Sequence, residues 1–372
     1  MSKFDFPIFI FGNGATIGSG YYLDGDRSKN PPTNQDFFRE LDPKWQYLMP
    51  ALGAVCDALN IEIQRVSLEM LWNYIYITRR YVEENLTSIV SRLDGFDEID
   101  LGGHYPIEEL SNPGVSLDEK LSRLAERDLI HLVWSILRRL KIPGNGMDNY
   151  EKLCKETGLV NEKNEIKKKF GVISFNYDIC LEESLRNQDS LLYYYPNFEH
   201  KYKNDLIPIF KLHGSLNWKH GYDGHVRPTD SYEIMQELEF VAKQPQLYPQ
   251  AWKNFMPMII PPTFFKEELF FRSGQERVRR HFNELWRRAY QLLCQGSCLI
   301  VIGSSFPEAD PHARWLLKAA GDKPSFIVNK CDEEKDKRKY ENIVTSCLNK
   351  VDGFCHNGFG ECFGEIKKFI NK

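Results

Sequence analysis

The sequence predicts an α/β fold of the Rossmann-like kind, with a mainly parallel sheet covered by helices on both faces and a large α-helical insertion after the first strand. Three observations predict this fold. A short apolar run, Ile8–Phe11, ends abruptly at a glycine-rich loop. Similar short runs return in the second half of the chain, as is typical of parallel strands that are buried on both faces. Between them lies a long segment whose apolar residues recur at helical spacing.

Composition narrows the class of protein further. The chain has 372 residues, which is enough for one large domain or two of ordinary size. Its formal net charge of -4 provides no overall basic field, so we expect no direct binding to nucleic acid and none to a membrane surface. No apolar run reaches the roughly 18 residues that a membrane span needs, and the N-terminus lacks the features of a signal peptide. A cytoplasmic location is therefore expected.

The cysteines indicate free thiols. There are nine of them, an odd number, and they are scattered without any C-x-x-C pair. Paired C-x-x-C motifs are the usual signature of a zinc ribbon, so we expect neither a zinc ribbon nor another metal site. This pattern is typical of thiols kept reduced in the cytosol.

The first predicted strand ends at Gly12-Asn13-Gly14, and a second cluster, Gly18-Ser19-Gly20, follows closely. Glycines directly after a buried strand allow a tight turn and a close approach to a ligand, and a helix that starts there would favour phosphate. The spacing departs from the dinucleotide fingerprint because Ile17 stands where the third glycine belongs. An ordinary turn without a ligand is therefore the alternative interpretation.

The middle of the chain is predicted to be helical. The clearest helix is expected from Ser116 to Leu140, with Ser116 as its cap and two acidic residues in its first turn, where the helix dipole favours negative charge. We expect residues 36–164 to form the α-helical insertion, and residues 1–35 and 165–372 to form one discontinuous Rossmann-like domain.

Five later strands are expected, with a helix from about Gly274 to Gln295 before the fourth of them. The strands are Gly171–Phe175, Leu206–Leu212, Met258–Ile260, Cys298–Ile302 and Ser325–Val328. In a parallel sheet of this kind, ligands bind at the carboxyl ends of the strands. Polar or glycine-rich residues follow nearly every strand at that edge. These segments are Ser174–Asp178, Lys211–Trp218, Gly303–His312 and Asn329–Lys330.

This series of segments resembles the sirtuin-like superfamily, and more closely its bacterial NAD-hydrolysing branch associated with antiphage defence. GNGATIGSG is similar to the GAGAS-type loop of the family, and SFNYD to its TxNYD segment. KLHGSLNW is similar to the catalytic His-Gly motif, and IGSSFPEADPH to the late Gly-Tyr-Ser…Asp-Pro-His segment. Protein deacylases of the superfamily carry two C-x-x-C pairs and a Pro-Asp-Phe-Arg motif. This chain has neither, and Tyr21-Tyr22-Leu23 follows its first loop instead.

The resemblance implies an NAD glycohydrolase, which cleaves NAD to nicotinamide and ADP-ribose with NAD as substrate and without a metal. It further implies the effector of an antiphage defence system, triggered by homo-oligomerisation or by a separate regulatory or sensor protein encoded nearby. Two alternatives stay open. One is a subunit that binds NAD or ADP-ribose without turnover, and the other is a protein-lysine deacylase.

The resemblance also implies site residues. Asn176 would bind the nicotinamide ribose or position the attacking water, His213 would be the general base, and Asp178 would orient its neighbours. The cofactor-binding residues would be Gly12, Asn13, Gly14, Ala15, Thr16, Gly303, Ser304, Ser305 and Asn329.

Structural roles remain possible for some of these residues. Asp178 could cap a helix that begins at Ile179, and Asp310 and His312 could cap or buttress the next helix. The arginines near residues 277–288 are expected to form a solvated face, with a subunit or nucleic-acid contact as the alternative.

Overall fold

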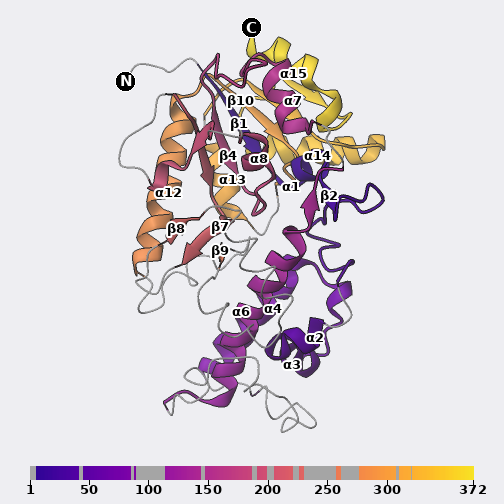
Figure 1. Cartoon of the computed structure of the whole chain (residues 1–372), viewed down its shortest axis with the longest axis vertical. Coiled ribbons are helices and arrows are strands. Elements are labelled where there is room, and N and C mark those ends of the chain that lie inside the picture. The colour runs from indigo at the N-terminus through magenta and orange to yellow at the C-terminus, as the bar shows by residue number, and fades with distance from the viewer. Residues whose placement is uncertain are drawn as a thin grey trace. The chain divides into compact units, whose positions relative to one another are not determined.

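The structure is a computed structural model of the whole chain, and Figure 1 traces its elements. It describes residues 6–41, 45–84, 88, 114–143, 147–186, 191–198, 205–220, 226–229, 257–260, 276–306, 310–319 and 321–372. The chain divides into two compact units, which we describe separately. The first consists of residues 1–31, 139–215 and 264–372, and the second of residues 32–138 and 216–263.

The first unit contains a seven-stranded sheet with the order β12-β11-β10-β1-β4-β6-β5. Every pairing in it is parallel. The strands are β1 (Pro7–Phe11), β4 (Gly171–Ser174), β5 (Tyr193–Tyr194), β6 (Ile207–Lys211), β10 (Cys298–Ile302), β11 (Ser325–Val328) and β12 (Gly353–Cys355). This topology confirms the predicted Rossmann-like fold. The first strand lies in the middle because β4, β5 and β6 are added on one side of it and β10, β11 and β12 on the other.

Helices cover both faces of this sheet. Phe9 and Phe11 of β1 point to one face, where the ring of Phe11 contacts that of Tyr150 in α7 (Asn149–Glu156) at 5.2 Å. On the other face lies α12 (Glu276–Gln295), whose Leu292 fills the space over Gly171, the register partner of Ile8. The fully apolar strands of the sequence are thus explained, because neither face of the sheet meets water.

Short helices and one small ribbon complete the first unit. The strands β2 (Tyr22–Leu23) and β3 (Leu140–Lys141) pair antiparallel. The helices and 3₁₀ turns are α1 (Asn13–Ile17), α8 (Cys180–Ser184), η4 (Pro196–Phe198), α13 (Pro311–Lys318), α14 (Glu334–Cys347), η6 (Phe359–Glu361) and α15 (Phe363–Ile370). The sequence pattern did not indicate β2, β3 or β12, because these strands are two or three residues long.

The second unit packs helices together with a small sheet. Its helices and 3₁₀ turn are α2 (Trp45–Leu48), α3 (Pro50–Ala58), η1 (Ile63–Arg65), α4 (Leu68–Glu83) and α6 (Leu117–Leu137). The predicted cap of α6 is confirmed, since the Ser116 hydroxyl accepts a hydrogen bond from the Glu119 N–H at 3.1 Å. The helix ends at Leu137, three residues earlier than expected.

One predicted strand belongs to a different sheet. Residues 258–260 were expected in the parallel sheet, but β9 (Pro257–Ile259) lies beside β7 (Gly214–His220), which also pairs with β8 (Val226–Pro228). The prediction was wrong because a three-residue apolar run carries no information about its pairing partner.

The two units follow the expected domain boundaries only in part. Residues 139–164 lie in the first unit, although they were expected in the helical insertion. Residues 216–263 lie in the second unit, although they were expected in the discontinuous domain. The assignment of domains therefore stays a prediction. Among the described residues, no helix has both the length and the apolar character needed to cross a membrane.

Candidate functional site

The centre of the candidate site is the carboxyl edge of the sheet where β1 and β10 lie side by side. The Gly12 N–H donates to the Ile302 carbonyl at 2.9 Å, and the Gly14 N–H donates to the Gly303 carbonyl at 2.8 Å. A Cβ on Gly12 would lie 2.6 Å from the Cα of Ser304. Strand order reverses at this point, which is where ligands bind in open α/β sheets. The glycines of the two loops are needed because the two backbones approach closely here.

The loops after β1 and β4 are joined by a buried hydrogen-bond network. The Asn176 amide donates from Nδ2 to the Gly12 carbonyl at 3.0 Å and to the Thr16 hydroxyl at 2.9 Å. The Thr16 hydroxyl in turn donates to Asp178 Oδ2 at 2.8 Å. The other oxygen of Asp178 accepts from the Cys180 N–H at 3.0 Å. Asp178 therefore contacts both Thr16 and the first residue of α8, whose N-cap residue is Ile179 and makes no side-chain cap bond. The predicted role of Asp178 in the site stays a prediction.

One buried side-chain atom of Asn176 has no hydrogen-bond partner among the residues that the structure describes. Its side-chain oxygen Oδ1 is buried and accepts no hydrogen bond from the described residues, and the residue as a whole is 6% exposed. The orientation of the amide follows from chemistry, since the Gly12 carbonyl can only accept and must therefore face the NH₂ group. A buried acceptor without a donor is costly, typically by about 1–3 kcal/mol. Oδ1 therefore keeps an unused capacity to accept a hydrogen bond.

His213 lies two residues after the end of β6 and contacts Phe175, the residue before Asn176. Its Nδ1 lies 3.1 Å from the carbonyl oxygen of Phe175, and its Nε2 lies 2.6 Å from Asp310 Oδ2. Asp310 also caps α13, with Oδ1 accepting from the Ala313 N–H at 3.1 Å. The predicted capping role of Asp310 is thus confirmed, while its contact with His213 was not anticipated.

A buried ion pair lies beneath the network. Lys211, the last residue of β6, places Nζ 3.0 Å from Glu182 Oε1, and both residues are at most 2% exposed. The same ammonium donates to the Asp178 carbonyl, and the Tyr195 hydroxyl donates to Glu182 Oε1 at 3.1 Å. Burial raises the pKa of Glu182, and the Lys211 charge opposes that rise. Sequence reasoning missed this pair, although a lysine within the apolar run Ile207–Leu212 was a visible signal.

The loop after β10 has an unusual backbone. Gly303 has a φ of 64°, and a Cβ on it would lie 2.0 Å from the Ala15 nitrogen. Phe306 has a φ of 49°, and Arg314 holds its carbonyl oxygen at 2.9 Å. The Tyr340 hydroxyl donates to the Ser304 carbonyl at 2.8 Å. These contacts fix the loop up to Phe306, and residues 307–309 of the predicted motif lie outside the described residues.

The predicted pyrophosphate donors are bonded within the chain. The Ala15 N–H donates to the Gly12 carbonyl at 2.9 Å, and those of Gly12 and Gly14 bond the β10 segment. The Thr16 hydroxyl donates its hydrogen to Asp178. Pyrophosphate binding through these groups would require an exchange of hydrogen bonds, and the assignment stays a prediction.

Three other predicted residues lie around the same edge. Asn13 and Ser305 are exposed. Asn329 is half-buried, and its N–H donates to the Cys355 carbonyl at 3.0 Å. The structure therefore brings Gly12, Thr16, Asn176 and Asp178 into one network, with His213 next to it through Phe175.

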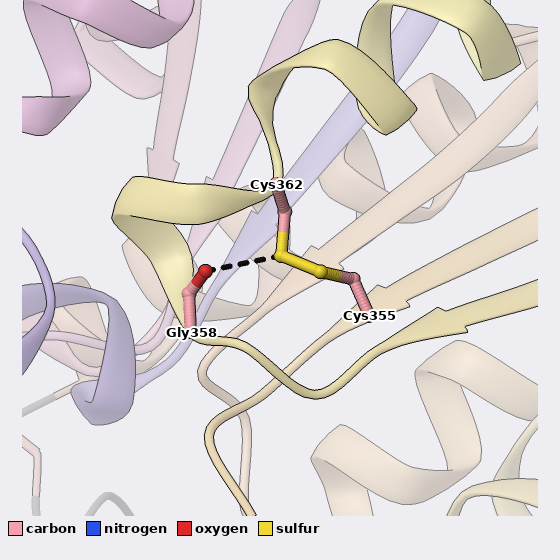
Figure 2. The surroundings of a disulfide bond; sticks show 3 residues. All are labelled: Cys355, Gly358 and Cys362. Atoms are coloured by element: carbon pink, nitrogen blue, oxygen red, sulfur yellow. Dashed lines mark hydrogen bonds between the residues drawn. A yellow bond between two sulfur atoms is a disulfide. The ribbon is translucent and has the colours of Figure 1, made fainter.

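One cysteine pair is oxidised, so the expectation of free thiols was wrong for these two residues. Cys355 and Cys362 form a disulfide that joins the end of β12 to the start of α15 (Figure 2). Figure 2 also shows the Cys362 sulfur near the Gly358 carbonyl oxygen, at 3.0 Å. Both cysteines are buried. Because pairing depends on the folded arrangement, the scattered positions in the sequence did not reveal it.

Among the residues that the structure describes, no group of three or more histidine, cysteine or acidic side chains is arranged to hold a metal ion.

Comparisons with known proteins give distant similarities only. No protein-family model and no curated protein matches the chain. Among solved structures, the chain is similar to a Sir2 enzyme studied for mechanism and regulation, with a TM-score of 0.38 and 15% identity over 99% of this chain and 92% of the other. It is also similar to Sir2Tm bound to a propionylated peptide, with a TM-score of 0.36 and 12% identity over 98% and 92% of the two chains.

A third similarity is to Sir2Af2 bound to a myristoylated histone peptide, with a TM-score of 0.33 and 15% identity. It covers 66% of this chain and 79% of the other. These likenesses are too distant to carry an inference about activity. The α/β, Rossmann-like class of the protein is established by its own strand order.

Proposed function

We propose that the protein binds NAD at the carboxyl edge of its parallel sheet and hydrolyses it to nicotinamide and ADP-ribose. The observation that carries the proposal is the Asn176 carboxamide. It is held by Gly12 and Thr16, and its buried oxygen has no donor in the described structure. In this proposal, a ribose hydroxyl or an attacking water supplies the donor that this oxygen lacks.

The reaction demands little acid catalysis, because nicotinamide leaves a cationic ring as a neutral molecule. The site has to hold the dinucleotide, support an oxocarbenium-like ribose and guide water. In the proposed arrangement, Asn176 Oδ1 accepts a hydrogen bond from the ribose or the water. His213, which contacts the carbonyl oxygen of Phe175 beside Asn176, accepts the proton. Asp178 accepts a hydrogen bond from the Thr16 hydroxyl and so fixes the group that holds Asn176.

The remaining binding roles are assigned to residues of the loops after β1 and β10, and to Asn329 after β11. Gly12, Asn13, Gly14, Ala15 and Thr16 would line the pyrophosphate. Gly303, Ser304 and Ser305 would face phosphate and the adenosine ribose, and Asn329 would face the adenosine ribose. The close approach of the Gly14 and Gly303 backbones supports a shared role for the two loops.

In the cell, we propose an effector of antiphage defence in the cytoplasm that depletes NAD when triggered. Uncontrolled hydrolysis would harm the host, so a partner protein or self-association would supply the switch. This part of the proposal rests on the resemblance of the sequence motifs.

The test is an assay of NAD turnover with the whole chain and each candidate trigger, measuring nicotinamide and ADP-ribose by chromatography. We expect Asn176→Ala to lower turnover about 10- to 100-fold, the value of a buried hydrogen bond to a charged or polarised group. Asn342→Ala, on the exposed face of α14, is the matched control and should retain full turnover. Full activity in Asn176→Ala would contradict the assignment.

A second candidate is a subunit that binds NAD or ADP-ribose without turnover. The specific observation in its favour is that both ring nitrogens of His213 already have partners within the chain. It predicts ligand binding with unchanged NAD under every trigger. A protein-lysine deacylase, the third candidate, would release nicotinamide only when an acylated peptide is present.

A further inference from the structure

The contact between His213 and Asp310 joins residues that are 97 positions apart in the sequence. Both are nearly inaccessible, with 4% of His213 and 1% of Asp310 exposed. The rings of Phe175 and Tyr177 flank the imidazole, with centroids 5.3 and 6.0 Å away. The pair is therefore shielded from water on several sides, and each polar atom needs a defined partner.

Hydrogen-bond chemistry fixes one of the two ring hydrogens. The Phe175 carbonyl can only accept, so Nδ1 of His213 carries a hydrogen and donates it. The 2.6 Å contact between Nε2 and Asp310 Oδ2 must also contain a hydrogen, because two lone pairs would repel at that distance. That hydrogen belongs either to an imidazolium that faces a carboxylate or to a carboxylic acid that faces a neutral imidazole.

The position of Asp310 favours the charged form of its side chain. Its Oδ1 accepts from the Ala313 N–H at the start of α13, and Pro311 is the first residue of that helix. The positive end of the helix dipole and a bonded N–H both favour a carboxylate. Charge-assisted N–H···O bonds are also characteristically short, as this one is.

We propose that Asp310 is a positioning residue for His213, which fixes the imidazole ring and keeps Nε2 protonated in the resting protein. The proposal rests on the proposed function, because it describes how the same site would be primed. When substrate enters, the Nε2 proton passes to the Asp310 carboxylate, and the imidazole ring turns so that the lone pair left on Nε2 leaves the Asp310 O–H and faces the ribose hydroxyl or water. Nε2 then takes the proton of that hydroxyl or water, so no proton is gained or lost overall.

Nitrogen NMR of histidine-labelled protein at neutral pH tests the proposal directly, with His213→Gln used to assign the signals. We expect both ring nitrogens of His213 to resonate as N–H nitrogens in the wild type. In Asp310→Asn, Nδ1 should stay protonated and Nε2 should change to the unprotonated type. Asparagine can still accept the hydrogen bond that caps α13, so this variant tests the loss of the negative charge alone.

Asp148→Asn is the matched control. Asp148 is likewise a buried helix cap, with one oxygen accepting from the Tyr150 and Glu151 N–H groups and the other from the Ser184 hydroxyl. This variant should leave the His213 signals unchanged. An unprotonated Nε2 in the wild type, or an unchanged spectrum in Asp310→Asn, would overturn the proposal. Should Asp310→Asn fail to fold, the wild-type spectrum alone still decides the protonation of Nε2.

Kinetics provide the second readout. If the protein hydrolyses NAD, Asp310→Asn should lower kcat about 10- to 100-fold with KM changed by no more than about twofold, since proton transfer and not binding is affected. An unchanged kcat would count against the proposal. The absence of any turnover in the wild type would refute the proposed function, whereas the NMR result would stand independently of it.

Discussion

At the scale of single residues, the candidate site depends on positions that tolerate no side chain. Gly303 combines a φ of 64° with a neighbour, the Ala15 nitrogen, only 2.0 Å from the place of a Cβ. Gly321 shares the backbone conformation, with a φ of 77°, yet nothing lies within 4 Å of its Cβ position. Substitutions at these two glycines therefore distinguish the free-energy cost of a left-handed backbone from the free-energy cost of a steric clash.

We expect Gly321→Ala to lower the free energy of unfolding by about 1–2 kcal/mol, the cost of the left-handed conformation. Gly303→Ala should lower it by at least about 2 kcal/mol more, because the β1 and β10 loops must also separate. Urea unfolding followed by circular dichroism measures both. Equal losses in the two variants would show that the loops have room to separate.

Asn176 illustrates how far sequence reasoning reaches at this scale. The resemblance of SFNYD to a family motif predicts a functional role for Asn176, which stays a prediction, and the structure adds the reason for the orientation of its amide, the bond to the Gly12 carbonyl. The unpartnered oxygen could not be predicted, because satisfaction of a buried atom depends on every neighbour in space.

At the scale of secondary-structure elements, β6 and α8 are joined by the buried Lys211–Glu182 pair. Removing one member of such a pair leaves a buried charge and typically costs about 3–5 kcal/mol. We expect Lys211→Met to destabilise the protein by that amount, as measured by urea unfolding at neutral pH.

The free energy of unfolding of Lys211→Met should depend on pH in a defined direction. Burial already raises the pKa of Glu182, and loss of the lysine raises it further. The folded state then holds the proton at a pH where the unfolded chain has lost it. The free energy of unfolding of Lys211→Met should therefore fall, relative to the wild type, as the pH rises from about 5 to 8. The double variant with Glu182→Gln should lack this slope, and a persistent slope would point to another group.

The disulfide links β12 to α15 across a short loop. Closing a loop of this size stabilises a folded chain by about 2–3 kcal/mol in the chain-entropy account. We expect dithiothreitol, or Cys362→Ser, to lower the free energy of unfolding by about that much. Cys294→Ser, at an exposed free cysteine, should have no comparable effect. Insensitivity to reductant would mean that the two thiols are free in solution.

At the scale of the whole molecule, ligand binding should report on the candidate site as a unit. A ligand that binds only the folded state, at 100 times its Kd, adds about 2.7 kcal/mol to the free energy of unfolding. We therefore expect ADP-ribose to raise the melting temperature of the wild type in a concentration-dependent manner. The shift should be smaller for Asn176→Ala at the same concentration. No shift at millimolar ADP-ribose would argue against a dinucleotide site.

The sequence by itself determined the fold class and the edge of the sheet that carries the candidate site. The strands Cys298–Ile302 and Ser325–Val328 begin and end where the apolar runs predicted. Apolar runs of strand length form buried parallel strands, and the carboxyl ends of such strands meet at one edge, so the residues that follow them must gather there.

Only the tertiary structure decided which side chains become partners. The bond from His213 to Asp310, the Lys211–Glu182 pair and the Cys355–Cys362 disulfide all require the folded chain, as does the placement of β9 in a separate sheet. The physical reason is that the spacing of apolar residues within a segment determines only which side of that helix or strand is buried. The distance between side chains on different elements is set by how those elements pack, and a single sequence does not carry that distance.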